Sequence, residues 1–154
     1  MSGEGLPTLD TDGTGLKVTI VSGLWHTRIS EGLLAGAHRV LDASGAEVSI
    51  VQVAGSFELP VVSKAALEAG ADAVVALGVI VRGETPHFDF VASAATDGLT
   101  RVALDTGKPV GFGGASADVL LGVGEPRAVE PLLLVLDGQH TESDRLAGVE
   151  RDPG

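Results

Sequence analysis

Three side chains suited to binding or catalysis stand just beyond apolar runs of the chain. Trp25, Glu58 and His87 each lie a few residues after a run rich in Val, Ile and Leu. An indole offers a flat face on which a heterocycle can stack, and a carboxylate accepts hydrogen bonds from hydroxyl groups. An imidazole takes up and releases protons near neutral pH. This combination indicates a pocket for a planar, hydroxylated molecule whose reaction includes proton transfer.

The segment just before His87 has the features of an anion site. Gly83 and Thr85 precede a predicted long helix, and the first amides of a helix, which have no partner within it, bind anions such as phosphate. Glu84 would point outward if the backbone binds the anion. Arg82 has two interpretations, which are a contact with phosphate and a salt bridge across a subunit contact.

Each of these residues also has a purely structural interpretation. Trp25 could pack at the rim of a sheet, Glu58 could cap a helix, and a single histidine is more often structural than catalytic. The position of His87 beside the predicted anion site favours a function. Gly55 lets the backbone approach a ligand, and Phe112-Gly113 could form a far wall. Covalent catalysis and the usual nucleotide sites are not indicated, because the sequence has no nucleophile beside a base, no Walker loop and no G-x-G-x-x-G motif.

The elements that must position these residues alternate along the chain. Apolar and β-branched runs predict strands at 16–21, 48–53, 73–81 and 109–112. Apolar residues at steps of three and four predict helices at 26–41, 59–69 and 88–103. This order predicts an α/β domain with a parallel sheet, right-handed crossovers and helices on both faces. Ligands bind such sheets beyond the carboxyl ends of the strands, which here means the segments 22–26, 54–58, 82–87 and 113–116.

Composition argues against several classes of protein. The chain has 154 residues, of which 44% are hydrophobic, and this suits one folded domain. A formal net charge of −11 without a basic cluster argues against nucleic acid or an anionic membrane as a partner. The histidines are scattered and cysteine is absent, so neither a metal site nor a disulfide is indicated. No apolar run is long enough to span a membrane and residues 1–14 do not form a secretory signal, so the cytoplasm is the default location.

Several stretches of the chain resemble lumazine synthase, an enzyme family of riboflavin biosynthesis. The similarity covers roughly residues 5–113, and its matching stretches are Trp25-His26, Gly55 to Pro60, Ala73 to Phe90, Gly98 to Val102 and Thr106 to Gly113. The block from Leu77 to Asp89, LGVIVRGETPHFD, is long and specific. The resemblance implies a flavodoxin-like three-layer sandwich with a four-stranded parallel sheet, in agreement with the fold expected from the pattern of elements.

The resemblance also implies a transferase activity. In the family, 5-amino-6-(D-ribitylamino)uracil condenses with 3,4-dihydroxy-2-butanone 4-phosphate to give 6,7-dimethyl-8-ribityllumazine, phosphate and water. The implied steps are Schiff-base formation, phosphate loss and ring closure with loss of water, and they need no metal or organic cofactor. Such chemistry depends mainly on the positioning of two substrates.

The same resemblance assigns roles to individual residues. Trp25 would stack on the pyrimidine ring, and His87 would be the catalytic residue that moves protons. The other substrate-binding residues would be Ser56, Phe57 and Glu58 for the ribityl chain, Val79, Ile80 and Val81 for the pyrimidine pocket, Glu84 and Thr85 for the phosphate, and Phe112 from a neighbouring subunit. The family's sites lie between the subunits of a homopentamer, and some members assemble pentamers into icosahedral shells.

The family pattern is expected to end at Gly113. We expect one domain over residues 1–154, with an N-terminal arm at 1–14 and an atypical tail at 114–154. The tail has no lysine, and its glycines and prolines disfavour a long helix. Arg127 is the predicted phosphate anchor of the tail, with Arg145 as the alternative.

Two other functions remain open from the sequence. The atypical tail would also suit a catalytically weak or inactive relative that binds flavin-like ligands or serves as an assembling shell protein. The fold alone would suit an FMN carrier or a signalling domain. That second alternative is weakened because no Asp-rich cluster or Ser/Thr-rich phosphate loop follows the first strand. The synthase is therefore the expected function.

Overall fold

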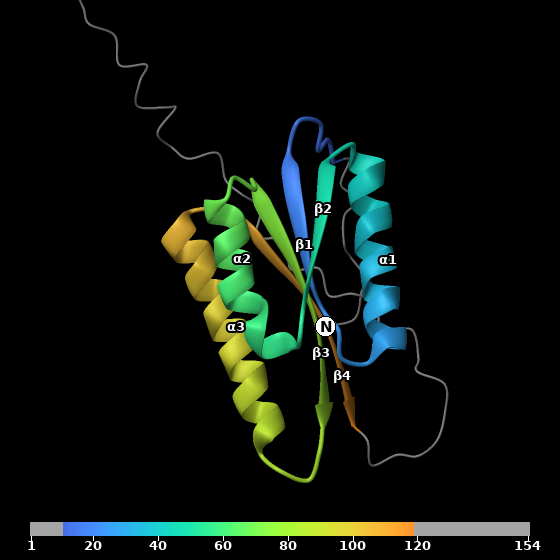
Figure 1. Cartoon of the computed structure of the whole chain (residues 1–154), viewed down its shortest axis with the longest axis vertical. Helices are drawn as coiled ribbons and strands as arrows, with labels where there is room; N and C mark the ends of the chain where they lie inside the picture. Colours follow the sequence, from blue (N-terminus) through green and yellow to red (C-terminus); the bar gives the residue numbers. More distant parts are fainter. Residues whose placement is uncertain (1–10, 119–154) are drawn as a thin grey trace, which may run out of the picture.

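Strands and helices alternate along the described part of the chain. The computed structural model describes residues 11–118 (Figure 1). The strands are β1 (Lys17–Gly23), β2 (Glu47–Val53), β3 (Ala73–Arg82) and β4 (Val110–Asp118). The helices are α1 (Thr27–Ser44), α2 (Leu59–Glu68) and α3 (His87–Thr106), and a short 3-10 turn, η1 (Ser56–Glu58), leads into α2. The predicted tail from residue 119 onward, which includes Arg127 and Arg145, lies outside the described residues.

The four strands form one parallel sheet in the order β2-β1-β3-β4. Helix α1 lies on one face of the sheet, and α2 and α3 lie on the other (Figure 1). The predicted α/β three-layer sandwich with a four-stranded parallel sheet is thereby confirmed. Because all strands run in the same direction, their carboxyl ends meet at one edge of the sheet, where α1 and α3 begin.

Alternate residues of β3 supply both layers of the core. Val74 and Ala76 belong to the cluster that packs under α2 and α3, whereas Val75 and Leu77 belong to the cluster under α1. This period of two is the geometry of a strand that is covered on both faces. Full burial of each Val or Leu side chain contributes about 1.5–3 kcal/mol, so β3 anchors the sheet from its centre.

Helix α3 shows why the spacing of apolar residues predicted a helix. Ala95, Leu99 and Val102 are buried at steps of four and three, and they face the sheet. The helix ends at Gly107, whose φ of 63° is left-handed, a conformation that glycine adopts without steric cost. The next residue, Lys108, reaches back to the end of α2, where its Nζ donates hydrogen bonds to the carbonyl oxygens of Leu67 at 2.9 Å and Ala71 at 2.8 Å.

The fourth strand is longer than the sequence predicted. It was expected to end at residue 112, but β4 continues to Asp118 and pairs with β3 along its whole length. The segment 113–116 is therefore strand and not a loop beyond the sheet, which corrects the prediction for this segment. The glycines and alanines of this stretch have low strand propensity, and the ladder with residues 77–82 of β3 overrides it.

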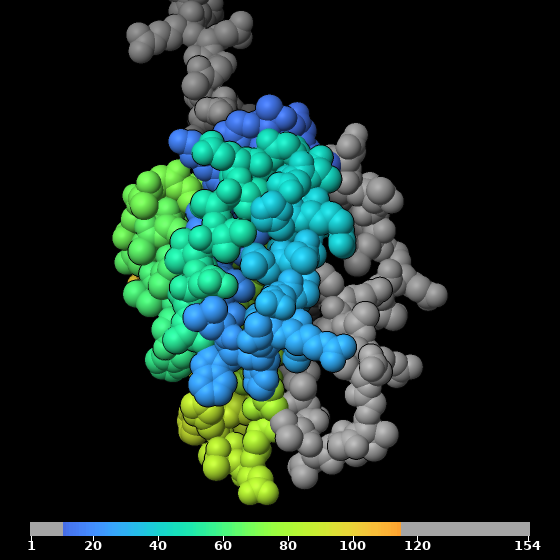
Figure 2. Space-filling model, turned by 45° about the vertical axis from the view of Figure 1, so that its right-hand side comes forward, coloured from blue at the N-terminus to red at the C-terminus, as the bar shows by residue number. Residues whose placement is uncertain are grey.

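No helix within residues 11–118 is long and apolar enough to cross a membrane. In the space-filling view, α1 (light blue) and β2 (teal) form one outer face, and the start of α3 (yellow-green) projects beyond the lower end of that face (Figure 2).

Candidate active site

A pocket of about 420 Å³ opens at the carboxyl ends of β1, β2 and β3. It is lined by Trp25, His26, Ala54, Gly55, Ser56, Phe57, Glu58, Val79, Ile80, Val81, His87 and Val91. The lining includes eight of the predicted site residues, drawn from three separate segments of the chain. The topology is responsible, because a parallel sheet places the segments that follow its strands at one edge.

Trp25 forms an exposed aromatic surface at the mouth of the pocket. Its side chain is 67% exposed, so it is not packed away at the rim of the sheet. The ring lies against Gly55, where an added Cβ would be 3.4 Å from the indole Cδ1. The next residue, His26, has a left-handed backbone (φ 58°, ψ 60°) and starts α1. The turn therefore ends β1 and leaves the indole face accessible to a ligand.

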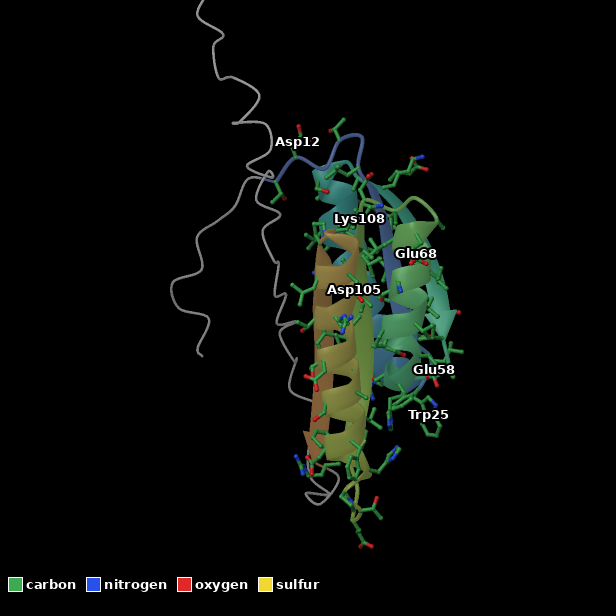
Figure 3. The ribbon with its side chains drawn as sticks, turned by 90° about the vertical axis from the view of Figure 1, so that its left-hand side faces the viewer. Asp12, Trp25, Glu58, Glu68, Asp105 and Lys108 are labelled. Carbon is green, nitrogen blue, oxygen red and sulfur yellow. The ribbon has the colours of Figure 1, made fainter. Side chains whose placement is uncertain are left out.

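The turn η1 holds a carboxylate beside this ring. Glu58 reaches back so that its Oε2 accepts a hydrogen bond from the backbone N–H of Gly55 at 2.9 Å. A carboxylate can accept further hydrogen bonds, so this one is oriented by the protein and still able to bind hydroxyl groups. Trp25 and Glu58 lie together at one end of the molecule (Figure 3). Glu58 therefore makes the capping contact of its structural interpretation and also lines the pocket.

Ser56 is positioned by its own side chain. The residue is buried, and its Oγ donates a hydrogen bond to the carbonyl oxygen of Val79 at 3.2 Å. This bond ties η1 to the end of β3. Since the hydroxyl proton is used inside the protein, the groups that Ser56 offers to a ligand are its backbone amide and the remaining lone pair of its oxygen.

The end of β3 forms the apolar floor of the pocket. Val79 is buried, while Ile80 and Val81 are partly exposed and line the cavity. An apolar floor excludes water from a bound ring, and the strand carbonyls and amides around it are fixed by the sheet. These properties suit a flat heterocycle with polar edges.

His87 is the first residue of α3 and lines the pocket, as the sequence predicted. Glu84 and Thr85 are exposed in the loop before it and do not line the cavity. Pro86 caps the helix, and its carbonyl oxygen accepts the N–H of Asp89 at 3.1 Å. The backbone N–H groups just before Asp89 precede the first hydrogen bond of the helix and so have no partner within it. They lie at the positive end of the helix dipole.

Arg82 has a partner that neither of its two interpretations included. Its Nη2 lies 3.5 Å from Oδ1 of Asp89, and its Cζ lies 4.1 Å from the centroid of the Phe88 ring. Both contacts are made within the chain, across the loop 83–86. Sequence spacing did not indicate them, because they depend on how the loop folds back.

Phe112, like Glu84 and Thr85, does not line the pocket within this chain. Phe112 lies near the start of β4 opposite Ala76 and packs against the core under α2 and α3. Arg127 lies outside the described residues. Val91 lines the pocket but was not among the predicted site residues. It stands one helical turn after His87, so helical spacing from that histidine is the signal that would have found it.

The sequence profile of the 6,7-dimethyl-8-ribityllumazine synthase family matches residues 15–118. The chain belongs to this family. The match extends past Gly113, where the similarity was expected to end. Family membership confirms the expected resemblance and, with it, an enzyme of the transferase class that acts in riboflavin biosynthesis.

Individual relatives carry the same name. A 6,7-dimethyl-8-ribityllumazine synthase from Leifsonia xyli subsp. xyli is 68% identical over 120 residues, which cover 77% of this chain and 76% of that protein. One from Clavibacter sepedonicus is 66% identical over 116 residues, covering 73% of this chain and 72% of that protein. One from Clavibacter michiganensis subsp. michiganensis is 62% identical over 159 residues, covering 100% of this chain and 88% of that protein. This last alignment includes the tail that the family profile does not reach.

Proposed function

We propose that the pocket between Trp25 and His87 is where the chain condenses 5-amino-6-(D-ribitylamino)uracil with 3,4-dihydroxy-2-butanone 4-phosphate. One observation carries the proposal: three strand ends bring an aromatic face, an oriented carboxylate and an imidazole into a single pocket. The pyrimidine stacks on Trp25 over the floor formed by Val79, Ile80 and Val81. The ribityl hydroxyls reach η1, with Ser56, Phe57 and Glu58 around them.

The keto-phosphate enters from the side of α3. Its phosphate binds at the amides near Glu84 and Thr85, where the helix dipole favours an anion. This placement sets the ketone beside the 5-amino group of the pyrimidine and within reach of His87. The protein's main contribution is then to hold two substrates in reacting geometry.

The chemistry requires proton transfer at each stage. The 5-amino nitrogen attacks the ketone carbon, and water leaves as the Schiff base forms. A proton is removed from the carbon next to the imine, and the C–O bond to phosphate breaks. The enol that remains takes up a proton and becomes a ketone, the ribityl-bearing nitrogen attacks this carbonyl carbon to close the second ring, and its oxygen leaves as another water. His87 accepts and returns these protons, a role that contributes about 10²–10⁴-fold to the rate.

We further propose that the pocket is completed by a second copy of the chain in a homopentamer. Trp25, Phe57 and Phe90 are large, exposed and apolar, and the first two line the pocket. Exposed apolar residues of this size mark contact surfaces. Phe112 of a second copy is the residue proposed to close the site. Pentamers that assemble further into an icosahedral shell, and a cytoplasmic location, belong to the same proposal.

The tail is proposed to supply one cation to the phosphate. A guanidinium binds phosphate through two hydrogen bonds, and its loss typically costs about 1.5–3 kcal/mol. Arg127 is favoured over Arg145 because it is closer in sequence to the end of β4. We expect Arg127→Ala to raise the KM for the keto-phosphate and Arg145→Ala to leave it unchanged. If both variants match the parent, the tail provides no anchor.

The activity is tested by mixing the purified protein with both substrates and following the absorbance of the lumazine. We expect product only when both substrates are present, with one phosphate released for each lumazine formed. A protein that binds a ribityl-pyrimidine in calorimetry but forms no lumazine would refute the proposed activity and favour an inactive relative.

A further inference from the structure

Arg82 links the end of β3 to the start of α3 across the loop 83–86. It is the last residue of the strand, and it contacts Phe88 and Asp89, which lie in the first turn of the helix. The guanidinium lies 4.1 Å from the Phe88 ring centroid and 3.5 Å from the Asp89 carboxylate. Stacking on an aromatic face together with an ion pair fixes the plane of an arginine side chain.

The loop that this contact spans carries the groups proposed to bind phosphate. The segment 83–86 leaves the strand at a glycine and enters the helix at Pro86. His87 immediately precedes the two residues that Arg82 touches. Arg82 joins the strand before this short loop to the helix after it. This link limits how the amides of the loop and the first helical turn can move relative to the sheet.

Arg82 also neutralises a charge that would oppose phosphate. Asp89 is an acid in the first turn of α3, where the helix dipole favours it. A carboxylate at that position competes with a bound phosphate for the same positive potential. The guanidinium of Arg82 lies 3.5 Å from the Asp89 carboxylate. Its positive charge reduces the repulsion between Asp89 and a bound phosphate.

The pair contributes little to overall stability. The side chains of Arg82 and Asp89 are 49% and 65% exposed, and ion pairs with this exposure typically contribute little to the free energy of unfolding. A structural role alone would therefore leave little trace in activity. An effect on the binding of one particular substrate would indicate a different role.

We propose that Arg82 is a positioning residue for phosphate binding, which acts through Asp89 and the loop 83–86 and makes no direct contact with the substrate. This inference rests on the proposed function, because it takes the phosphate of the keto-phosphate to bind at that loop. It predicts that the consequences of losing Arg82 depend on whether Asp89 is charged.

The test compares Arg82→Met, Arg82→Lys, Asp89→Asn and the double variant Arg82→Met with Asp89→Asn. We expect Arg82→Met to raise the KM for the keto-phosphate about five-fold, equivalent to about 1 kcal/mol, while the KM for the pyrimidine substrate stays within about two-fold. Arg82→Lys, which retains the charge, should recover part of this loss. The decisive comparison is the double variant, which should bind the keto-phosphate better than Arg82→Met alone.

Arg101→Met is the matched control. Arg101 lies on α3, the helix that carries Asp89, and pairs with Asp105 at 2.6 Å between the Arg101 Nε and the Asp105 Oδ1, but it does not line the pocket. Its replacement should change neither KM. A double variant as weak as Arg82→Met, or weaker, would mean that Arg82 contacts phosphate directly and would overturn the proposal. Parental values for all variants would also overturn it.

A second measurement separates this inference from the proposed activity. Binding of radiolabelled inorganic phosphate is measured by equilibrium dialysis for the same set of variants. If the parent protein forms no lumazine, the proposed activity fails. The positioning role is still supported if Arg82→Met weakens phosphate binding and Asp89→Asn restores it. It is overturned if phosphate binding is the same in all variants.

Discussion

Ser56 occupies the space beside Gly78 that a side chain would need. A Cβ on Gly78 would lie 2.6 Å from the Oγ of Ser56 and 2.9 Å from a methyl group of Leu59. The same serine hydroxyl donates to the carbonyl oxygen of Val79. This close approach of η1 to β3 brings the segment that carries Glu58 against the floor of the pocket.

Gly78→Ala should therefore destabilise the protein. Inserting one methyl group into a packed contact typically costs about 1–3 kcal/mol, and both neighbours here belong to buried residues. We expect a lower urea midpoint and a raised KM for the pyrimidine substrate, because η1 must shift. Gly32→Ala is the control, since Gly32 lies within α1 with nothing within 4 Å of its added Cβ. That variant should gain about 0.5–1 kcal/mol, and equal effects at the two positions would contradict the packing argument.

Lys108 stabilises the opposite end of the molecule from the pocket (Figure 3). Its ammonium group donates to two carbonyl oxygens at the end of α2, and hydrogen bonds to a charged group typically contribute about 1.5–3 kcal/mol. Lys108→Met should lower the free energy of unfolding by about that amount in a urea titration and leave kcat and both KM values unchanged.

The matched control for Lys108 is Lys64→Met. Lys64 pairs with Glu68 at 3.7 Å on an exposed helix surface, so its loss should cost less than about 0.5 kcal/mol. If the two lysine variants unfold at the same midpoint, the carbonyl contacts of Lys108 contribute nothing measurable.

The fold was predictable where burial imposes a period on the sequence. Strand β3 was recognised because both of its faces are covered, and α3 because its buried residues recur at helical spacing. The extension of β4 was not predictable, because Gly113-Gly114 carries no strand signal of its own. That part of the strand is specified by hydrogen bonds to β3, which is distant in the sequence.

Trp25 should report directly on the proposed stacking. It is the only tryptophan in the chain and its side chain is 67% exposed at the pocket mouth. Stacking of a pyrimidine on the indole should quench its fluorescence in a saturable way. A ribityl-pyrimidine analogue that binds in calorimetry but leaves the emission unchanged would place the ligand away from Trp25.

The site was predictable from topology more than from individual residues. Trp25, Glu58 and His87 are far apart in the sequence. Because ligands bind at the carboxyl ends of parallel strands, the predicted topology placed all three at the same edge of the sheet. The internal contacts of Ser56 and Arg82 were not foreseen. Each depends on the exact approach of a loop to a strand or a helix, which residue types and spacing do not encode.

The central claim, that this pocket makes lumazine with the help of His87, is tested most directly by comparing lumazine formation in the parent, His87→Ala and His38→Ala. His38 is the matched control because it lies on α1, pairs with Asp42 at 2.8 Å and does not line the pocket. We expect His87→Ala to reduce kcat by about 10²–10⁴-fold and to leave the mass of the oligomer unchanged. We expect His38→Ala to retain the parental kcat. An unchanged kcat in His87→Ala would contradict the account and remove this histidine from the mechanism.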